Sequence, residues 1–153
     1  MEITAYKLAS RYLDVEEIYG GEDHPLIQWW LMNCGFGPEA HDETPWCAAF
    51  VNGIAWELGL PRPRFPSRAR SWLTVGLEIQ LSASTAAWDI AILQRGSGAQ
   101  PPASVIDAPG HVGFVASWSD EDVTLLGGNQ ANCVSIASFH RSRLLGVRRL
   151  QWL

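Results

Sequence analysis

The chain has 153 residues, of which 47% are hydrophobic and 18% are charged, and its formal net charge is −5. This length suits one domain with a core of its own, and the acidic balance disfavours the basic surface of a nucleic-acid-binding protein. The composition also excludes collagen-like, coiled-coil and disordered classes. No apolar run reaches the ~18 residues that a membrane span needs, and the first residues lack the pattern of a secretory signal.

Charge is distributed unevenly along the chain. Residues 1–60 contain ten acidic and two basic residues, whereas residues 61–153 contain six acidic residues and nine bases, all of them arginine. The simplest interpretation is a solvated acidic helical face followed by arginines near strand ends. A lone lysine beside ten arginines is nevertheless better suited to binding planar carboxylates than to carrying loose surface charge.

The first half of the chain has the spacing of apolar residues that is typical of helices. Pro25 follows Asp23 and His24 and is suited to the first turn of a helix, while Gly59 marks the end of a later one. We expect helices over residues 3–13, 26–34 and 44–58, and a short helix over residues 67–75.

The second half has the alternation and the turn residues that are typical of strands. Strands are expected over residues 88–93, 111–118, 123–128, 133–139 and 145–150. Residues 94–110 are rich in Gly, Ser, Pro and Ala, and we expect them to form a surface loop. Helices followed by antiparallel strands predict an α+β fold in one domain that spans residues 1–153.

Cys47 is the candidate nucleophile because of its place in the segment ETPWCAAF. Thr44 is a natural N-cap and Pro45 fits the first helical position, so Cys47 is expected at about the third position, inside the first helical turn. The free N–H groups and the helix dipole stabilise an anion there, which lowers the pKa of a thiol and raises its reactivity. The alternative is that Cys47 packs in the core as a small apolar residue.

The other two cysteines have no comparable setting. Cys34 is expected at a helix end, where the dipole disfavours a thiolate, and Cys133 at the start of a strand. Both are expected to be small residues of the core. The cysteines and the four histidines match no zinc-binding spacing, so no metal or other cofactor is expected.

His111 is the candidate base, since a thiolate needs a nearby histidine and that histidine needs a residue to orient it. It opens a predicted strand, and the next strand follows the turn at residues 119–121. If those three residues form the hairpin loop, His111 lies opposite Asn129 on one face of the sheet. Gly113 and Gly127 form the next pair on that face, and they leave room for a helix end or a substrate backbone.

This register predicts a Cys-His-Asn site in which Asn129 directs one nitrogen of the His111 ring toward the sulfur. A slip of one residue would place Gln130 opposite His111, so Gln130 is the second candidate for the orienting residue, and otherwise a candidate for substrate binding. Trp46 and Trp72 are core candidates that could instead line a groove for a sugar or a peptide.

An acidic cluster precedes the helix that is expected to carry the nucleophile. It consists of Glu39, His41, Asp42 and Glu43. These residues are most simply explained as first-turn acids and a solvated loop, although a calcium site is conceivable. Because the chain lacks a clear Asp-x-Asp-Gly loop, no metal site is assigned.

Five segments, taken in this order, resemble a CHAP/NlpC-type cysteine peptidase, and the match is closest to a small phage and bacterial group of that superfamily. They are ETPWCAAFVN, SRARSWL, AWDIAIL, GHVGFV and LLGGNQ, and the resemblance extends from about Thr4 to Arg148. The joint pattern of TPWC, GHVGFV and GGNQ is specific, although each piece alone is not. The resemblance implies a papain-like α+β fold, with N-terminal helices packed on a small antiparallel sheet.

The resemblance places the nucleophile at Cys47, the base at His111 and the polar third residue at Asn129. Many CHAP relatives carry Glu-x-Asn at the third site, but Gly127 stands where that glutamate would be, so only the asparagine can be carried over. The resemblance also implies hydrolysis of an amide bond in bacterial peptidoglycan, by an endopeptidase or an N-acetylmuramoyl-L-alanine amidase. No separate wall-binding domain is visible, so targeting would rest with the catalytic domain itself.

We therefore expect a peptidoglycan hydrolase in which the Cys47 thiolate attacks the amide carbon and His111 protonates the leaving amine. The Cys47 backbone N–H is expected to stabilise the oxyanion, and Asp89 to cap the sheet near the site as a structural residue. The alternatives are an acyltransferase or transglutaminase on the same fold, and a non-catalytic cell-wall or phage structural module.

The expected setting of the protein follows from the same observations. A monomer without nucleic-acid partners is expected, made in the cytoplasm without a signal peptide. It would act on the cell wall after release or export, as a phage endolysin does.

Overall fold

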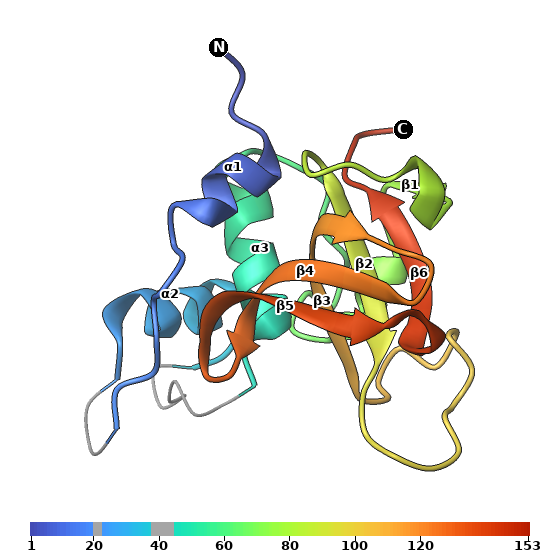
Figure 1. The fold of residues 1–153 in the computed structure, drawn as a ribbon. Coiled ribbons are helices and arrows are strands. Elements are labelled where there is room, and N and C mark those ends of the chain that lie inside the picture. Colours follow the sequence, from blue (N-terminus) through green and yellow to red (C-terminus); the bar gives the residue numbers. More distant parts are fainter. Residues whose placement is uncertain (20–22, 38–44) are drawn as a thin grey trace.

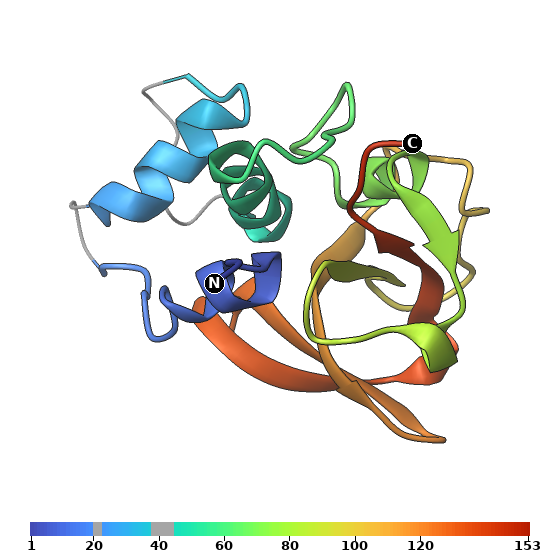
Figure 2. The same cartoon turned by 90° about the horizontal axis from the view of Figure 1, so that it is seen from above.

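The computed structural model describes residues 1–19, 23–37 and 45–153. Helices gather on one side of the molecule and a six-stranded antiparallel sheet lies on the other (Figures 1 and 2). The α+β class expected from the sequence is therefore confirmed. None of the helices in the described ranges has the length and the apolar content that a membrane crossing needs.

The sheet has the strand order β1-β6-β2-β3-β4-β5, and every neighbouring pair is antiparallel. Its strands are β1 (Leu77–Ile79), β2 (Asp89–Gln94), β3 (Gly110–Trp118), β4 (Asp122–Gln130), β5 (Cys133–His140) and β6 (Leu144–Arg149). Strands β2 to β6 match the five expected ones to within two residues. The prediction missed β1, whose three residues are too few to show an alternating pattern.

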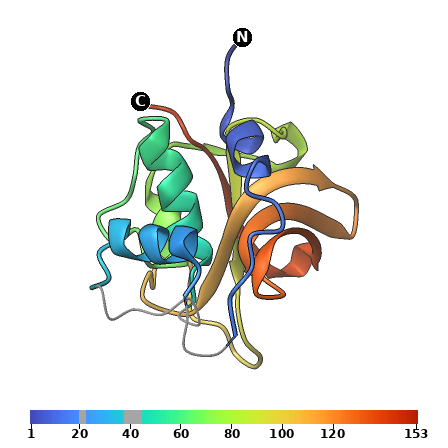
Figure 3. The same ribbon diagram turned by 90° about the vertical axis from the view of Figure 1, so that its left-hand side faces the viewer.

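The helical layer consists of α1 (Ala5–Ser10), α2 (Pro25–Asn33) and α3 (Cys47–Glu57). His24 caps α2 by accepting a hydrogen bond from the Leu26 backbone N–H at Nδ1, with Pro25 at the start of the helix as expected. The view from the helical side shows α2 crossing in front of α3 (Figure 3). The expected helix over residues 67–75 is a 3-10 helix, η1 (Ala69–Thr74).

α1 is shorter than the helix expected over residues 3–13, and the sheet explains why. Asp14 adopts a left-handed conformation with a φ of 73°, which ends the helical path. The Asp14 N–H then donates to the carbonyl of Val134, and the Val134 N–H donates to that of Val15. Residues 11–13 therefore remain a turn, with N–H groups that donate to the carbonyls of Leu8, Ala9 and Ser10, before the chain pairs with the start of β5.

The sheet buries residues on both of its faces. Along β2, Ile90 and Ile92 belong to the core beneath the helices, while Ala91 and Leu93 belong to a second apolar cluster on the opposite face. This alternation is the period of two expected for a strand with two covered faces. α3 packs against β3 and β4, and this contact brings the first residue of α3 close to the sheet strand that begins at Gly110.

The connection between β2 and β3 is the surface loop that its composition predicts. Arg70 holds this loop in place: its fully buried guanidinium donates to the carbonyls of Pro101, Pro102 and Pro109 at 3.0–3.2 Å. It also donates to the Gln100 side chain. A buried cation therefore ties the loop to η1.

Candidate active site

Cys47 is the first residue of α3, with Trp46 as the N-cap. Cys47 therefore occupies the first helical position, and the expectation that it occupies about the third is wrong. Thr44, the expected N-cap, lies outside the described residues. The Trp46 indole fixes this start, because it is fully buried, stacks on Trp30, and donates from Nε1 to a carboxylate oxygen of Glu17 at 2.9 Å. The first N–H groups of a helix have no partner within it, so the thiol sits at the positive end of α3.

The surroundings of Cys47 act on its thiol in opposite directions. Burial raises the pKa of the thiol. His111 lowers this pKa through a hydrogen bond and its positive charge, and a hydrogen bond from the Val112 backbone N–H and the charge of the Arg95 guanidinium lower it further. The net result is a pKa below the ordinary value of a cysteine. A low pKa makes the thiolate, the nucleophilic form, available near neutral pH.

His111 lies on β3, next to Val112, and its ring is almost completely buried. The ring packs against Phe139 of β5 with 5.2 Å between the ring centroids. Its Nε2 atom is hydrogen-bonded to Oε1 of Gln130 at 2.9 Å. This bond leaves Nδ1 as the ring nitrogen that is available to the Cys47 thiol.

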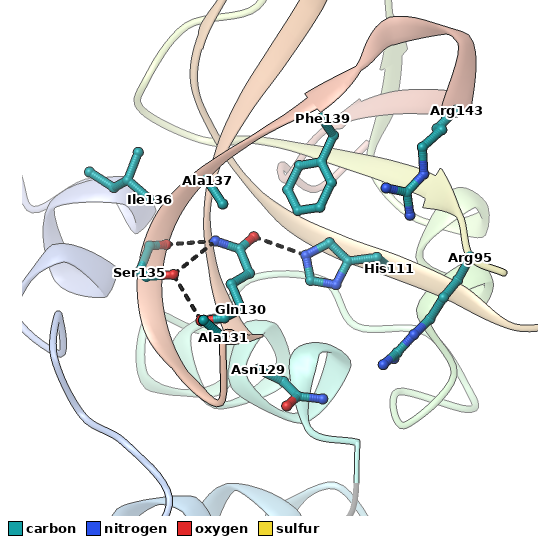
Figure 4. Close-up of a pocket in the computed structure, with 10 residues that line it drawn as sticks. All are labelled: Arg95, His111, Asn129, Gln130, Ala131, Ser135, Ile136, Ala137, Phe139 and Arg143. Carbon is teal, nitrogen blue, oxygen red and sulfur yellow. Dashed lines mark hydrogen bonds between the residues drawn. The ribbon is translucent and has the colours of Figure 1, made fainter.

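Gln130 is the residue that orients His111, and its amide is held in place from the other side. Its Nε2 atom donates to the carbonyl of Leu125 at 3.2 Å and to the carbonyl of Ser135 at 2.7 Å. Figure 4 shows the Gln130 side chain between Ser135 and the His111 ring, whereas the Asn129 side chain extends in a different direction. The amide oxygen therefore faces the ring as an acceptor.

The expected pairing of His111 with Asn129 is thus wrong, although the register near the site is the expected one. The hairpin turn is one residue longer than expected, because Trp118 pairs with Val123. A bulge between Val115 and Ser117 compensates for the extra residue, so Phe114 pairs with Leu126 as the predicted hairpin requires. Beyond Gly127 the register of β4 against β5 shifts, and Asn129 has a φ of 55°. This left-handed residue breaks the alternation and turns the next side chain, that of Gln130, toward the histidine.

Gly127 provides the space that Gln130 occupies. A Cβ atom at this position would lie 2.6 Å from Oε1 of Gln130 and 3.5 Å from Nε2 of His111. A Cβ atom on Gly113 would instead meet Leu125 and the Leu126 carbonyl. The room left by these two glycines is therefore filled by the protein's own side chains, and not by a helix end or a substrate as the sequence suggested.

The three residues expected to bind substrate are all buried in the structure. Trp46 and Trp72 both have an exposed fraction of 0%, and the Trp72 Nε1 donates to the Pro66 carbonyl. Gln130 is buried, and both ends of its amide are used within the protein. Trp46 and Trp72 are core residues, which was the alternative interpretation, and their indoles fill the layer between the helices and the sheet.

Two cavities flank the candidate site. One, of about 410 Å³, is lined by His111 and Asn129 and by the side chains of Arg95 and Arg143. The other, of about 350 Å³, is lined by Cys47 and by Arg68 and Arg95, among others. Arg95 is exposed and contributes to both, so it is a functional candidate that the sequence analysis missed. Its position at the start of a Gly/Ser-rich loop gave no signal of this placement.

Cys34 and Cys133 lie outside the site. Cys34 caps the end of α2, and its burial raises the pKa of its thiol to about 12. Cys133 starts β5, is half-buried, and donates from its sulfur to the Gln130 carbonyl. Within residues 1–19, 23–37 and 45–153, no group of three metal-ligating side chains comes together. The acidic cluster at residues 39–43 lies outside these ranges.

Asp89 has a structural role, but not near the site. Its buried carboxylate pairs with the Arg149 guanidinium at 2.8 Å and accepts from the Thr85 backbone N–H. It begins β2, whereas the end of this strand at Gln94 lies beside Gly110 and the candidate site. Asp89 is therefore a structural residue as expected, but it lies at the end of β2 that is remote from the site.

Neither a protein-family model nor a curated protein sequence matches this chain. Among solved structures, the chain is similar to the structure of NlpC1 from Trichomonas vaginalis, with a TM-score of 0.47 and 14% sequence identity over 95% of this chain. It covers 42% of the length of that protein. At this identity the likeness concerns the fold alone, and no residue assignment rests on it.

Proposed function

We propose that this chain is a cysteine hydrolase that cleaves amide bonds of bacterial peptidoglycan. The observation that carries the proposal is the position of His111 between the Cys47 thiol and the buried amide of Gln130. A nucleophile, a base and an orienting residue in contact with one another are the arrangement that acyl transfer through a thiol requires.

The chemistry follows from this arrangement. The Cys47 thiolate attacks the carbonyl carbon, and the oxyanion that forms is stabilised by the backbone N–H of the same residue at the helix N-terminus. Protonated His111 donates its proton to the amine as the C–N bond breaks, which leaves a thioester on Cys47. His111 then takes a proton from water, the water oxygen attacks the thioester, and the thiolate is released with a carboxylate product.

Hydrolysis is favoured over acyl transfer to an amine by the surroundings of the thiol. The cavities on either side of the site have exposed lining residues, including Arg68, Arg95 and Asp107. Water can therefore reach the thioester, whereas a transferase must exclude it. The contact of the Cys47 thiol with a histidine that Gln130 holds in place argues against a module that only keeps the fold.

Peptidoglycan is proposed as the substrate on the basis of the motifs around Cys47 and His111 and of the charge near the site. Three arginines, Arg68, Arg95 and Arg143, line the flanking cavities. Guanidinium groups bind carboxylates in a bidentate manner, and stem peptides of peptidoglycan carry carboxylates.

Digestion of purified peptidoglycan, with mass spectrometry of the released fragments, tests the proposal. New N-termini within the stem peptides would identify an endopeptidase, and glycan freed of intact stem peptides would identify an amidase. We expect Cys47→Ala to release nothing and the matched variant Cys133→Ala to retain most of the activity. Equal fragment release by Cys47→Ala and the unmodified chain would overturn the mechanism, and no cleavage by the unmodified chain would overturn the substrate.

A further inference from the structure

A third cavity lies at the opposite end of α3 from Cys47. It has a volume of about 590 Å³, and its lining includes Trp56, Trp152, Arg62 and Arg64. We refer to these four residues as the tryptophan groove. Cys47 and Glu57 are the two ends of α3, so at 1.5 Å per residue the groove begins roughly 15 Å from the nucleophile. The hydrogen bond from Trp152 to the Gly59 carbonyl brings the C-terminal segment to this end of α3, and Figure 3 shows the two near each other.

The two indoles of the groove are exposed but held in place. Trp56 has an exposed fraction of 50%, and Trp29 packs edge-to-face against it with 5.4 Å between the ring centroids. Trp152 has an exposed fraction of 72%, and its Nε1 donates to the Gly59 carbonyl at 2.9 Å. Large exposed apolar side chains that gather at a cavity mark interaction sites, and rings fixed in advance lose little entropy on binding.

The charge of the groove is opposite to that of the protein. Arg62 and Arg64 both line it, and none of its described lining residues is acidic, although the chain carries a net charge of −5. The Arg62 guanidinium donates to the Asn52 side chain at 3.4 Å, and the Arg64 guanidinium lies over the Phe65 ring at 5.3 Å. Charge complementarity therefore indicates an anionic ligand, for which the planar arginines favour carboxylate groups.

We propose that the tryptophan groove binds a glycan strand that carries carboxylate groups. The flat faces of Trp56 and Trp152 suit the apolar C–H faces of pyranose rings, and Arg62 and Arg64 suit carboxylates between them. The inference rests on the proposed function in one respect, the choice of a wall glycan as the strand. A nucleic acid fits poorly, because the protein as a whole is acidic.

This groove would let the catalytic domain recognise the cell wall by itself. A strand bound at the far end of α3 keeps neighbouring peptide bonds close to Cys47 and raises their effective concentration there. The groove is separate from the cavities at the thiol, since none of its four residues lines either of them. Binding and cleavage can therefore be measured independently.

The experiment measures binding to the full chain carrying Cys47→Ala by titration calorimetry. The ligand is soluble wall glycan from which the stem peptides have been removed, so that its lactyl carboxylates are free. Chito-oligosaccharides of equal length supply a neutral glycan, and poly-glutamate supplies an acidic peptide. We expect the wall glycan to bind more tightly than both.

Variants locate the binding. Trp56→Ala, Trp152→Ala and Arg64→Ala should each weaken binding of the wall glycan about tenfold, equivalent to about 1.4 kcal/mol. Trp118→Ala is the matched control for the indoles, because Trp118 has an exposed fraction of 40% and lies under a guanidinium outside the groove. Arg141→Ala, which removes that guanidinium, is the matched control for Arg64. Both controls should bind as the parent does.

Several results would overturn the proposal. Equal binding of chito-oligosaccharides would exclude the carboxylate contact, and tighter binding of poly-glutamate would exclude a glycan. Unchanged binding in Trp152→Ala together with Arg64→Ala would place the ligand elsewhere. Because the chain used for binding carries Cys47→Ala, these results do not depend on hydrolysis. Intact glycan binding combined with no cleavage of peptidoglycan by the unmodified chain would overturn only the proposed function.

Discussion

The Nε2 atom of His111 lies 2.9 Å from Oε1 of Gln130, and this contact fixes the proton on the ring. The Gln130 amide nitrogen donates to the carbonyls of Leu125 and Ser135, so its oxygen is the atom that faces the histidine. An oxygen acceptor requires a hydrogen on Nε2 of the ring. The other nitrogen, Nδ1, is then the one that is available to the Cys47 thiol.

Replacing Gln130 should impair catalysis more than replacing Asn129. Gln130→Ala leaves the His111 ring without its acceptor, and we expect kcat to fall roughly 10- to 100-fold, equivalent to about 1.5–3 kcal/mol. Asn129→Gly is the matched control, since glycine tolerates the φ of 55° at this position. Initial rates of peptidoglycan cleavage and thermal unfolding of both variants check the prediction. A larger loss in Asn129→Gly would restore asparagine as the third residue.

Cys47 should react with iodoacetamide faster than the other thiols in mildly acidic solution. Its pKa is lowered, so its thiolate persists as the pH falls, whereas burial raises the pKa of Cys34 to about 12 and keeps that thiol protonated. Arg95→Gln removes a positive charge that lowers the Cys47 pKa, and it should move the midpoint of the reactivity profile to higher pH. Peptide mass mapping across a pH series measures each cysteine. An unchanged midpoint in Arg95→Gln would contradict the contribution of this arginine.

Gly127→Ala should disable the site with little loss of the fold. The added Cβ would lie 2.6 Å from Oε1 of Gln130, so the amide must move away from His111. We expect activity to fall about tenfold or more. Gly146→Ala is the control, because its Cβ would meet only the end of the flexible Leu73 side chain, at 2.7 Å. Comparable activity losses in both variants, measured beside their melting temperatures, would show a general packing effect instead.

Arg70→Lys should destabilise the protein even though it preserves the charge. Lysine cannot reproduce the fan of hydrogen bonds to the carbonyls of Pro101, Pro102 and Pro109, and we expect a loss of about 2–3 kcal/mol in the free energy of unfolding. Arg68→Lys, at an exposed position two residues earlier, should change it by less than about 0.5 kcal/mol. Urea unfolding followed by tryptophan fluorescence compares the two variants. Equal stabilities would show that the loop does not depend on Arg70.

Activity should survive treatment with EDTA, because the proposed nucleophile and base need no metal. Peptidoglycan cleavage before and after chelation and desalting measures this. Loss of activity that calcium restores would indicate a metal site in the acidic cluster at residues 39–43. Rescue by zinc alone would contradict the thiolate mechanism, since it would make Cys47 and His111 metal ligands.

Local patterns were sufficient to predict most of the sheet and the proximity of Cys47 and His111. Strands β2 to β6 repeat apolar residues with a period of two, and their turns carry recognisable residues. Cys47, the candidate nucleophile, has a helix-start signature, and His111, the candidate base, lies at the start of a strand with clear alternation. These features depend on residues that are close in sequence, which is why they are visible without a structure.

The residue that contacts His111 on its other side could not be predicted in the same way. Whether the side chain of Asn129 or that of Gln130 faces the histidine depends on one backbone angle, the φ of Asn129. The hairpin register is correct at Phe114 and Leu126, but the left-handed conformation of Asn129 exchanges the sides of the residues that follow. The burial of Trp46 and Trp72 could not be predicted either, since a tryptophan in a core and one that lines a groove have the same sequence pattern. Both depend on contacts between the helical layer and the sheet.

Cys47 and His111 lie on different elements, α3 and β3, so the surroundings that lower the pKa of the Cys47 thiol cannot form until both elements have been synthesised. Cys47 leaves the ribosome 64 positions before His111, so a growing chain contains an ordinary thiol with neither its base nor the β3 backbone beside it. The helices must dock on the finished sheet before the thiolate is stabilised. An incomplete or partly unfolded chain therefore lacks the surroundings that lower the pKa of this thiol, and fast reaction of Cys47 with a thiol reagent indicates that the two layers have assembled.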